Sequence, residues 1–98
     1  MAQLDVFRTS AGEHLLDFQA DLLSHLNTRF VVPLARPADG PKPAARLNPK
    51  FIIDGEEMVL YTQFAMTVPV SDLTNRVASL DDHRFAVMGA IDMLISGY

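Results

Sequence analysis

The stretch Phe51–Thr62, with the sequence FIIDGEEMVLYT, is the clearest structural signal in this chain. Two apolar runs flank the dipeptide Asp54-Gly55. Asp-Gly is a favoured turn of tight β-hairpins, because both central residues of such a turn need positive φ angles. The stretch therefore predicts a β-hairpin and, with it, an antiparallel sheet.

Four other segments have the pattern of strands. Residues 3–7 alternate polar and apolar side chains, and residues 15–20 place apolar side chains at every second position. Residues 29–34 are an apolar run, and residues 67–70 are a short β-branched segment. Residues 21–27 predict a turn or a single helical turn. The fold expected is mainly β (α+β), with five or more antiparallel strands.

The C-terminal part changes from a strand pattern to a helical one. Residues 79–82 resemble the capping box of a helix N-terminus, and within residues 85–95 only Gly89 and Asp92 are not apolar. A helix that is apolar nearly all round is buried on two sides. We expect one side to pack on the sheet and the other on a second copy of the chain. One shared side consists of Val87, Ala90, Ile91 and Leu94.

The composition is that of one small domain over residues 1–98. Of these residues 49% are hydrophobic and none is cysteine, which excludes a disulfide framework, zinc-finger spacings and a thiol nucleophile. Large exposed apolar patches are rare on monomers, so the apolar excess predicts an oligomer. Neither a membrane-spanning run nor a signal-peptide pattern is visible, and we expect a cytoplasmic protein without a membrane partner.

Charge is distributed unevenly along the chain. The net charge of −4 argues against an uncomplicated nucleic-acid-binding protein. Between Arg29 and Lys50, however, five basic residues face Asp39 alone. Most of this stretch is a proline-rich loop over residues 36–50, and loops of this length are usually functional or mobile. The stretch either attracts an acidic partner or is simply a solvated loop, which is the commoner case.

No motif for catalysis or metal binding stands out. The three histidines, His14, His25 and His83, lie in unrelated segments, and no pair has the spacing of a metal-binding helix. The serines lack a nucleophile-elbow pattern, and no glycine-rich phosphate loop is present. We therefore expect no catalytic residue, no metal and no cofactor.

Four segments resemble the CcdB toxins of CcdA/CcdB toxin–antitoxin modules. They are DFQADLL at 17–23, RFVVPL at 29–34, VPV at 68–70 and AIDMLISGY at 90–98. The resemblance covers nearly the whole chain and implies a small SH3-like barrel with a C-terminal helix, assembled as a homodimer. It also implies a poison that binds the dimerisation domain in the A subunit of DNA gyrase and traps gyrase on cleaved DNA. A CcdA-like antitoxin would neutralise it and act with it in transcriptional autoregulation, so that DNA is contacted only through the antitoxin or gyrase.

The resemblance also assigns residues to partners. The gyrase-contacting positions of the family correspond to Leu22, Leu23, Asp92, Ile95, Ser96, Gly97 and Tyr98. We expect the dimer interface at Met88, Ile91, Met93, Leu94 and Ile95. From the local charge excess, we expect the antitoxin to contact Arg36, Lys42 and Arg46. The best-known members carry tryptophan at the position of Ser96 and isoleucine at that of Tyr98. The tryptophan gives those members a large apolar stacking surface, so Ile95 and Tyr98 would have to supply much of that area here.

Two other interpretations remain open. Toxins of the MazF/Kid type are similar to CcdB in fold and cleave messenger RNA, which requires a basic groove with acid–base groups. Alternatively, the chain is a degenerate toxin that still binds its antitoxin but no longer poisons gyrase, and Ser96 motivates this second possibility.

Overall fold

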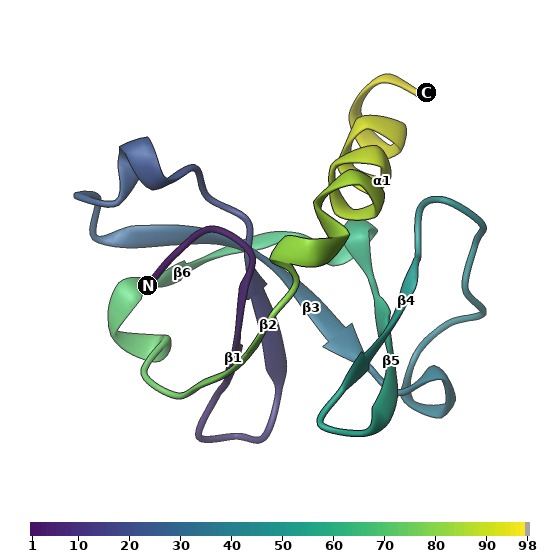
Figure 1. Cartoon of the computed structure of the whole chain (residues 1–98), viewed down its shortest axis with the longest axis horizontal. Coiled ribbons are helices and arrows are strands. Elements are labelled where there is room, and N and C mark those ends of the chain that lie inside the picture. The colour runs from purple at the N-terminus through teal and green to yellow at the C-terminus, as the bar shows by residue number, and fades with distance from the viewer. Residues whose placement is uncertain (98) are drawn as a thin grey trace.

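The computed structural model describes residues 1–97, in which seven short strands form one strongly curved antiparallel sheet with a single α-helix at its C-terminal end (Figure 1). The strands are β1 (Asp5–Arg8), β2 (His14–Asp17), β3 (Thr28–Ala35), β4 (Lys50–Ile53), β5 (Glu56–Leu60), β6 (Met66–Pro69) and β7 (Arg76–Ser79). The helix is α1 (Arg84–Ser96). The expectation of a mainly β, SH3-like barrel with a C-terminal helix is confirmed.

The long strand β3 organises the sheet. The strand order is β4-β5-β3-β2-β1-β7, and β6 pairs with β3 outside this path. Along one edge of β3, the first half pairs with β6 and the last two residues pair with β5. β2 pairs with β3 along its other edge. One strand thus joins two parts of the sheet, which curve around a common core.

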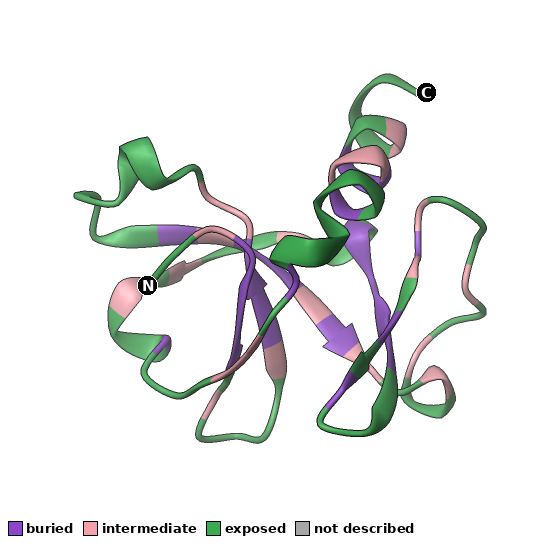
Figure 2. Cartoon of the chain, viewed as in Figure 1, coloured by how far each residue is buried: buried purple, intermediate pink, exposed green. Residues whose placement is uncertain are grey.

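The core lies inside this curved sheet and is closed on one side by α1. Val6, Leu16 and Leu60 from the sheet and Val87 and Ala90 from α1 belong to one cluster of buried residues. Figure 2 shows the same division, with buried residues on the strands and on one side of the helix. Burial of apolar surface is the dominant favourable term in folding, so this cluster contributes strongly to the stability.

The predicted hairpin forms as expected. β4 and β5 pair from Lys50 opposite Val59 to Ile53 opposite Glu56. Asp54 and Gly55 both have positive φ angles, of 52° and 78°, as a tight hairpin turn requires.

Two local predictions were wrong, and one strand was not predicted. β2 ends at Asp17 instead of continuing to residue 20, and the N–H of Gln19 donates to the Asp17 carboxylate instead of to a neighbouring strand. β7 was not predicted, since its sequence RVAS has no apolar run and its partner β1 is distant in sequence. Ser79 does not cap α1: its hydroxyl accepts the N–H of Asp81 in a 3₁₀ turn that precedes the helix.

The long loop over residues 36–50 is irregular, as predicted, but it is tied to the barrel. The Asn48 side chain is buried and donates to the carbonyl of Leu60 at 3.0 Å. The Thr62 hydroxyl donates to the carbonyl of Leu47 at 2.6 Å, and the Tyr61 hydroxyl donates to that of Pro41 at 2.9 Å. No helix in residues 1–97 is long and apolar enough to cross a membrane.

Gly40 is expected to tolerate no side chain. A Cβ atom at Gly40 would lie 2.5 Å from Cζ of the buried Tyr61 ring, so a methyl group must displace the ring and break its bond to Pro41. We expect Gly40→Ala to lower the free energy of unfolding by about 2–3 kcal/mol in urea denaturation. Tyr61→Phe removes the hydrogen bond alone and should cost about 1 kcal/mol. Equal losses in the two variants would show that the ring moves aside freely.

Candidate protein-binding surface

A segment between β2 and β3 exposes three leucines. This segment, residues 20–27, is called the leucine arm below, and it contains a 3₁₀ turn over Asp21–Leu23. Every residue in it is exposed, including Leu22, Leu23 and Leu26, and the Leu22 side chain is 88% exposed. The leucine arm protrudes from the sheet on the same side as the outer end of α1 in the view of Figure 1.

The outer end of α1 is the second apolar projection. Ile95 is 78% exposed and Leu94 is 42% exposed, because the helix extends past the barrel that covers its first turns. Gly97 ends the helix with a φ of 81°, and its N–H donates to the carbonyl of Met93 at 3.0 Å, an arrangement that favours glycine. The Ser96 hydroxyl donates to the carbonyl of Asp92 at 2.8 Å. The gyrase-contacting residues expected from the sequence therefore lie on these two projections, and Tyr98 lies outside the described residues.

The helix has only one buried side within a single chain. Val87, Ala90 and Ile91 are buried, whereas Phe85 on the opposite side is 94% exposed. Of the residues expected in the dimer interface, Met88 and Met93 are half-buried, Leu94 and Ile95 are exposed, and Ile91 is buried inside its own chain. A second copy would have to cover the remaining apolar side.

A groove runs beside this exposed side of α1. It has a volume of about 590 Å³ and is lined by Arg46, Pro49, Phe85, Ala86, Met88, Gly89 and Asp92. Its lining is mostly apolar, and Arg46 brings one positive charge to it from the long loop. Grooves of this size and character are suited to a side chain or short segment of a partner.

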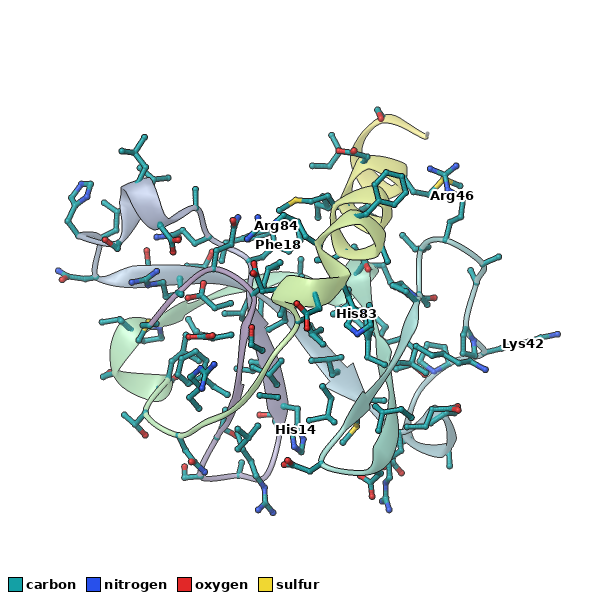
Figure 3. The ribbon with its side chains drawn as sticks, in the orientation of Figure 1. His14, Phe18, Lys42, Arg46, His83 and Arg84 are labelled. Carbon is teal, nitrogen blue, oxygen red and sulfur yellow. The ribbon has the colours of Figure 1, made fainter. Side chains whose placement is uncertain are left out.

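The basic stretch counted in the sequence does not form one surface patch. Arg29 is buried against Asp17, Arg36 is paired with Asp39 at 2.9 Å, and Lys50 lies 3.9 Å from a Glu57 oxygen. The Asp39 hydrogen bond and charge raise the pKa of Arg36 above its already high value. The Lys42 side chain points away from the barrel and Arg46 lies beside α1 (Figure 3). The three residues expected to contact the antitoxin thus face different surroundings.

The structure also brings together ionisable residues that their sequence spacing did not reveal. One hollow of about 420 Å³ is lined by Arg8, Glu13, His14, Arg36, Asp39 and Glu56, together with apolar residues. They come from β1, β2, β5 and the connections between strands, so no local motif could reveal them. Two arginines face three carboxylates here, and such a balance does not attract nucleic-acid phosphates. Within residues 1–97, no group of histidine and carboxylate side chains could hold a metal ion.

The leucine arm is anchored near a buried ion pair. Arg29 and Asp17 are 3% and 0% exposed, and Arg29 Nη1 lies 3.4 Å from Asp17 Oδ2. Burial raises the pKa of Asp17, while the hydrogen bond from the N–H of Gln19 and the charge of Arg29 lower it to a smaller extent. Arg29 Nη2 donates to the carbonyl of Ser24, within the leucine arm, at 3.3 Å.

This raised pKa predicts how stability changes with pH. The folded chain keeps the Asp17 proton at pH values where the unfolded chain has lost it, so the contribution of this group is largest below the unfolded pKa and declines as the pH rises through the folded one. A variant without either charge, Asp17→Leu/Arg29→Met, is therefore expected to gain stability relative to wild type as the pH rises above the pKa of an unfolded aspartate, about 4. Urea denaturation across this range measures the difference, and a pH-independent difference would contradict the assignment.

Comparison with known proteins identifies the family. A solved structure titled "Crystal structure of Mtb toxin" has the same fold, with a TM-score of 0.69 and 18% sequence identity over 88% of this chain and 94% of that chain. No curated protein sequence gives a significant match. The family model described as CcdB protein matches residues 3–97. Since this match spans nearly the whole sequence, the chain belongs to the CcdB family, the toxins of toxin–antitoxin modules.

Proposed function

We propose that this toxin acts by binding, as a homodimer, to the dimerisation domain in the A subunit of DNA gyrase, called the gyrase dimerisation domain below, and trapping gyrase on cleaved DNA. The observation that carries the proposal is the pair of apolar projections on a CcdB fold: the leucine arm with Leu22 and Leu23, and the end of α1 with Ile95. Neither projection contributes to the core. Exposed apolar groups of this size mark protein-binding sites more often than they serve folding.

Ser96 reduces the apolar contact area that the end of α1 can offer to a partner. A serine cannot supply the large apolar contact that aromatic anchors give an interface. In this chain, the Ser96 hydroxyl is turned back to the carbonyl of Asp92, so that within residues 1–97 the exposed apolar area at the end of α1 comes from Leu94 and Ile95. The leucine arm would then carry a greater share of the binding energy.

The homodimer and the antitoxin complex belong to the same proposal. A second copy would cover the exposed side of α1, where Phe85, Met88 and Leu94 have no full cover within one chain. The antitoxin would contact the face of the long loop with Lys42 and Arg46, and also Arg36 at the beginning of this loop. The toxin–antitoxin complex would repress transcription of its own module, with the antitoxin making the DNA contacts.

A cleavage assay with purified gyrase tests this function. Relaxed or supercoiled plasmid is incubated with gyrase, ATP and the toxin, and linear DNA is measured after denaturation and protease treatment. We expect linear DNA only when both gyrase and toxin are present. Absence of linear DNA with saturating toxin would overturn the proposal.

The same preparation distinguishes the other two interpretations. Purified RNA cut by the toxin alone would indicate a MazF/Kid-type nuclease, and His14→Ala would then be expected to remove the activity, since His14 lines the ionisable hollow. Tight binding of the antitoxin without effect on gyrase or RNA would indicate a degenerate toxin. The balanced charge of the hollow favours the gyrase proposal over RNA cleavage.

A further inference from the structure

The leucine arm keeps a defined shape without any buried side chain. A 3₁₀ turn of three residues is too short to be stable in isolation. Three backbone hydrogen bonds lie within the leucine arm, from Leu23 N–H to Ala20, from Ser24 N–H to Asp21 and from Leu26 N–H to Leu23, and the carbonyl at its end, that of Asn27, accepts the N–H of Val70. Since all residues 20–27 are exposed, apolar packing on the barrel cannot account for its position.

Two side chains that flank the leucine arm, Gln19 after β2 and Arg29 on β3, bind consecutive carbonyls of the arm. Gln19 Nε2 donates to the carbonyl of Leu23 at 2.9 Å, and Arg29 Nη2 donates to that of Ser24 at 3.3 Å. Both side chains are themselves fixed. Gln19 Oε1 accepts the N–H of Phe30 at 3.2 Å, and the Arg29 guanidinium lies against Asp17.

Burial of the Arg29–Asp17 pair costs free energy of desolvation. Burying two charges requires desolvation that their attraction barely repays, and apolar residues of similar volume are often equally stabilising. Arg29 Nε is also buried without a hydrogen-bond partner among residues 1–97, which adds to the cost. Orientation of the Arg29 guanidinium toward the carbonyl of Ser24 would give the pair a role other than stability.

We propose that Gln19 and Arg29 are positioning residues, which hold the carbonyls of Leu23 and Ser24 so that the leucine arm presents Leu22 and Leu23 to the target in a preformed shape. A preformed surface loses less conformational entropy on binding than a flexible one. The identity of the target as gyrase rests on the proposed function, whereas the positioning itself does not.

Two conservative variants separate positioning from folding. Gln19→Glu keeps an acceptor for the N–H of Phe30 but turns a carboxylate oxygen toward the carbonyl of Leu23, which releases that end of the leucine arm. Arg29→Lys keeps a positive charge for Asp17, but a single ammonium group lacks the forked geometry that also reaches Ser24. Gln63→Glu and Arg76→Lys are the matched controls, because Gln63 accepts a hydrogen bond from Asn48 and Arg76 pairs with Asp5, and neither interaction includes a residue of the leucine arm.

Amide hydrogen exchange on the purified full chain is the first measurement. In Gln19→Glu and Arg29→Lys, we expect the amides of Ser24 and Leu26 to exchange about tenfold faster than in wild type, with the amides of β1–β5 unchanged. The control variants should leave Ser24 and Leu26 as they are. Unchanged exchange in the leucine arm, or equal acceleration in the core, would overturn the proposal.

The affinity for the isolated gyrase dimerisation domain is the second measurement. We expect a loss of about tenfold in both variants and none in the controls. Faster exchange in the leucine arm with wild-type affinity would overturn the proposed role in presentation. If the wild-type toxin itself does not bind the domain, the proposed function fails, and hydrogen exchange alone then decides whether Gln19 and Arg29 position the leucine arm.

Discussion

Leu22→Ser/Leu23→Ser is expected to reduce the affinity for the gyrase dimerisation domain by about a hundredfold or more, while the melting temperature stays at the wild-type value. Both leucines are exposed, so their removal takes nothing from the core. In a complex, each buried leucine would contribute about 1.5–3 kcal/mol of transfer free energy. Calorimetric titration against the domain measures the affinity, and differential scanning calorimetry measures the stability.

Ile52→Ser provides the matched control for this variant. Ile52 is also a large exposed apolar residue, but it lies on β4, away from the leucine arm. Its replacement should leave the affinity unchanged. Wild-type affinity in the double leucine variant, or an equal loss in Ile52→Ser, would remove the leucine arm from the proposed binding surface.

Ile91→Asp is expected to unfold most of the protein at room temperature. Ile91 lies on the buried side of α1, and a carboxylate placed there would lose most of its hydration. The expected loss is about 4 kcal/mol or more, which is a large part of the stability of a domain of this size. Circular dichroism and urea denaturation measure the loss of folded protein.

Leu94→Asp, about one helical turn further along, distinguishes the core from the proposed dimer interface. Leu94 is 42% exposed within one chain, so a carboxylate there can reach solvent and this variant should fold. In sedimentation velocity it should behave as a monomer, because a charge would enter the interface with the second copy. A folded, stable Ile91→Asp variant would contradict the assignment of the buried side, and a dimeric Leu94→Asp variant would contradict that of the interface.

The elements that could be predicted from the sequence are those with strong local signals. Asp54-Gly55 fixes its own turn through positive φ angles, and the apolar run of residues 85–95 identifies the helix without any tertiary information. β7 has no such signal, because it becomes a strand only by pairing with β1 at the other end of the sequence. The beginning of α1 was misplaced because the chain first makes a 3₁₀ turn at Asp81–His83.

The candidate site was harder to predict because exposure is a tertiary property. The family resemblance assigned Leu22 and Leu23 to a contact surface, but only the structure shows that they and Leu26 are exposed on a protruding segment. Arg29 belongs to the basic stretch of the sequence but is buried with Asp17. The residues of the ionisable hollow come from separate strands and connections, so the sequence could not show that they are neighbours.

Titration of the purified toxin into the isolated gyrase dimerisation domain tests the central claim most directly. The proposed function predicts saturable binding, with one toxin dimer for each dimer of the domain, and loss of this binding in Leu22→Ser/Leu23→Ser but not in Ile52→Ser. Absence of binding at concentrations at which the toxin is folded and dimeric would contradict the claim that this chain acts on gyrase.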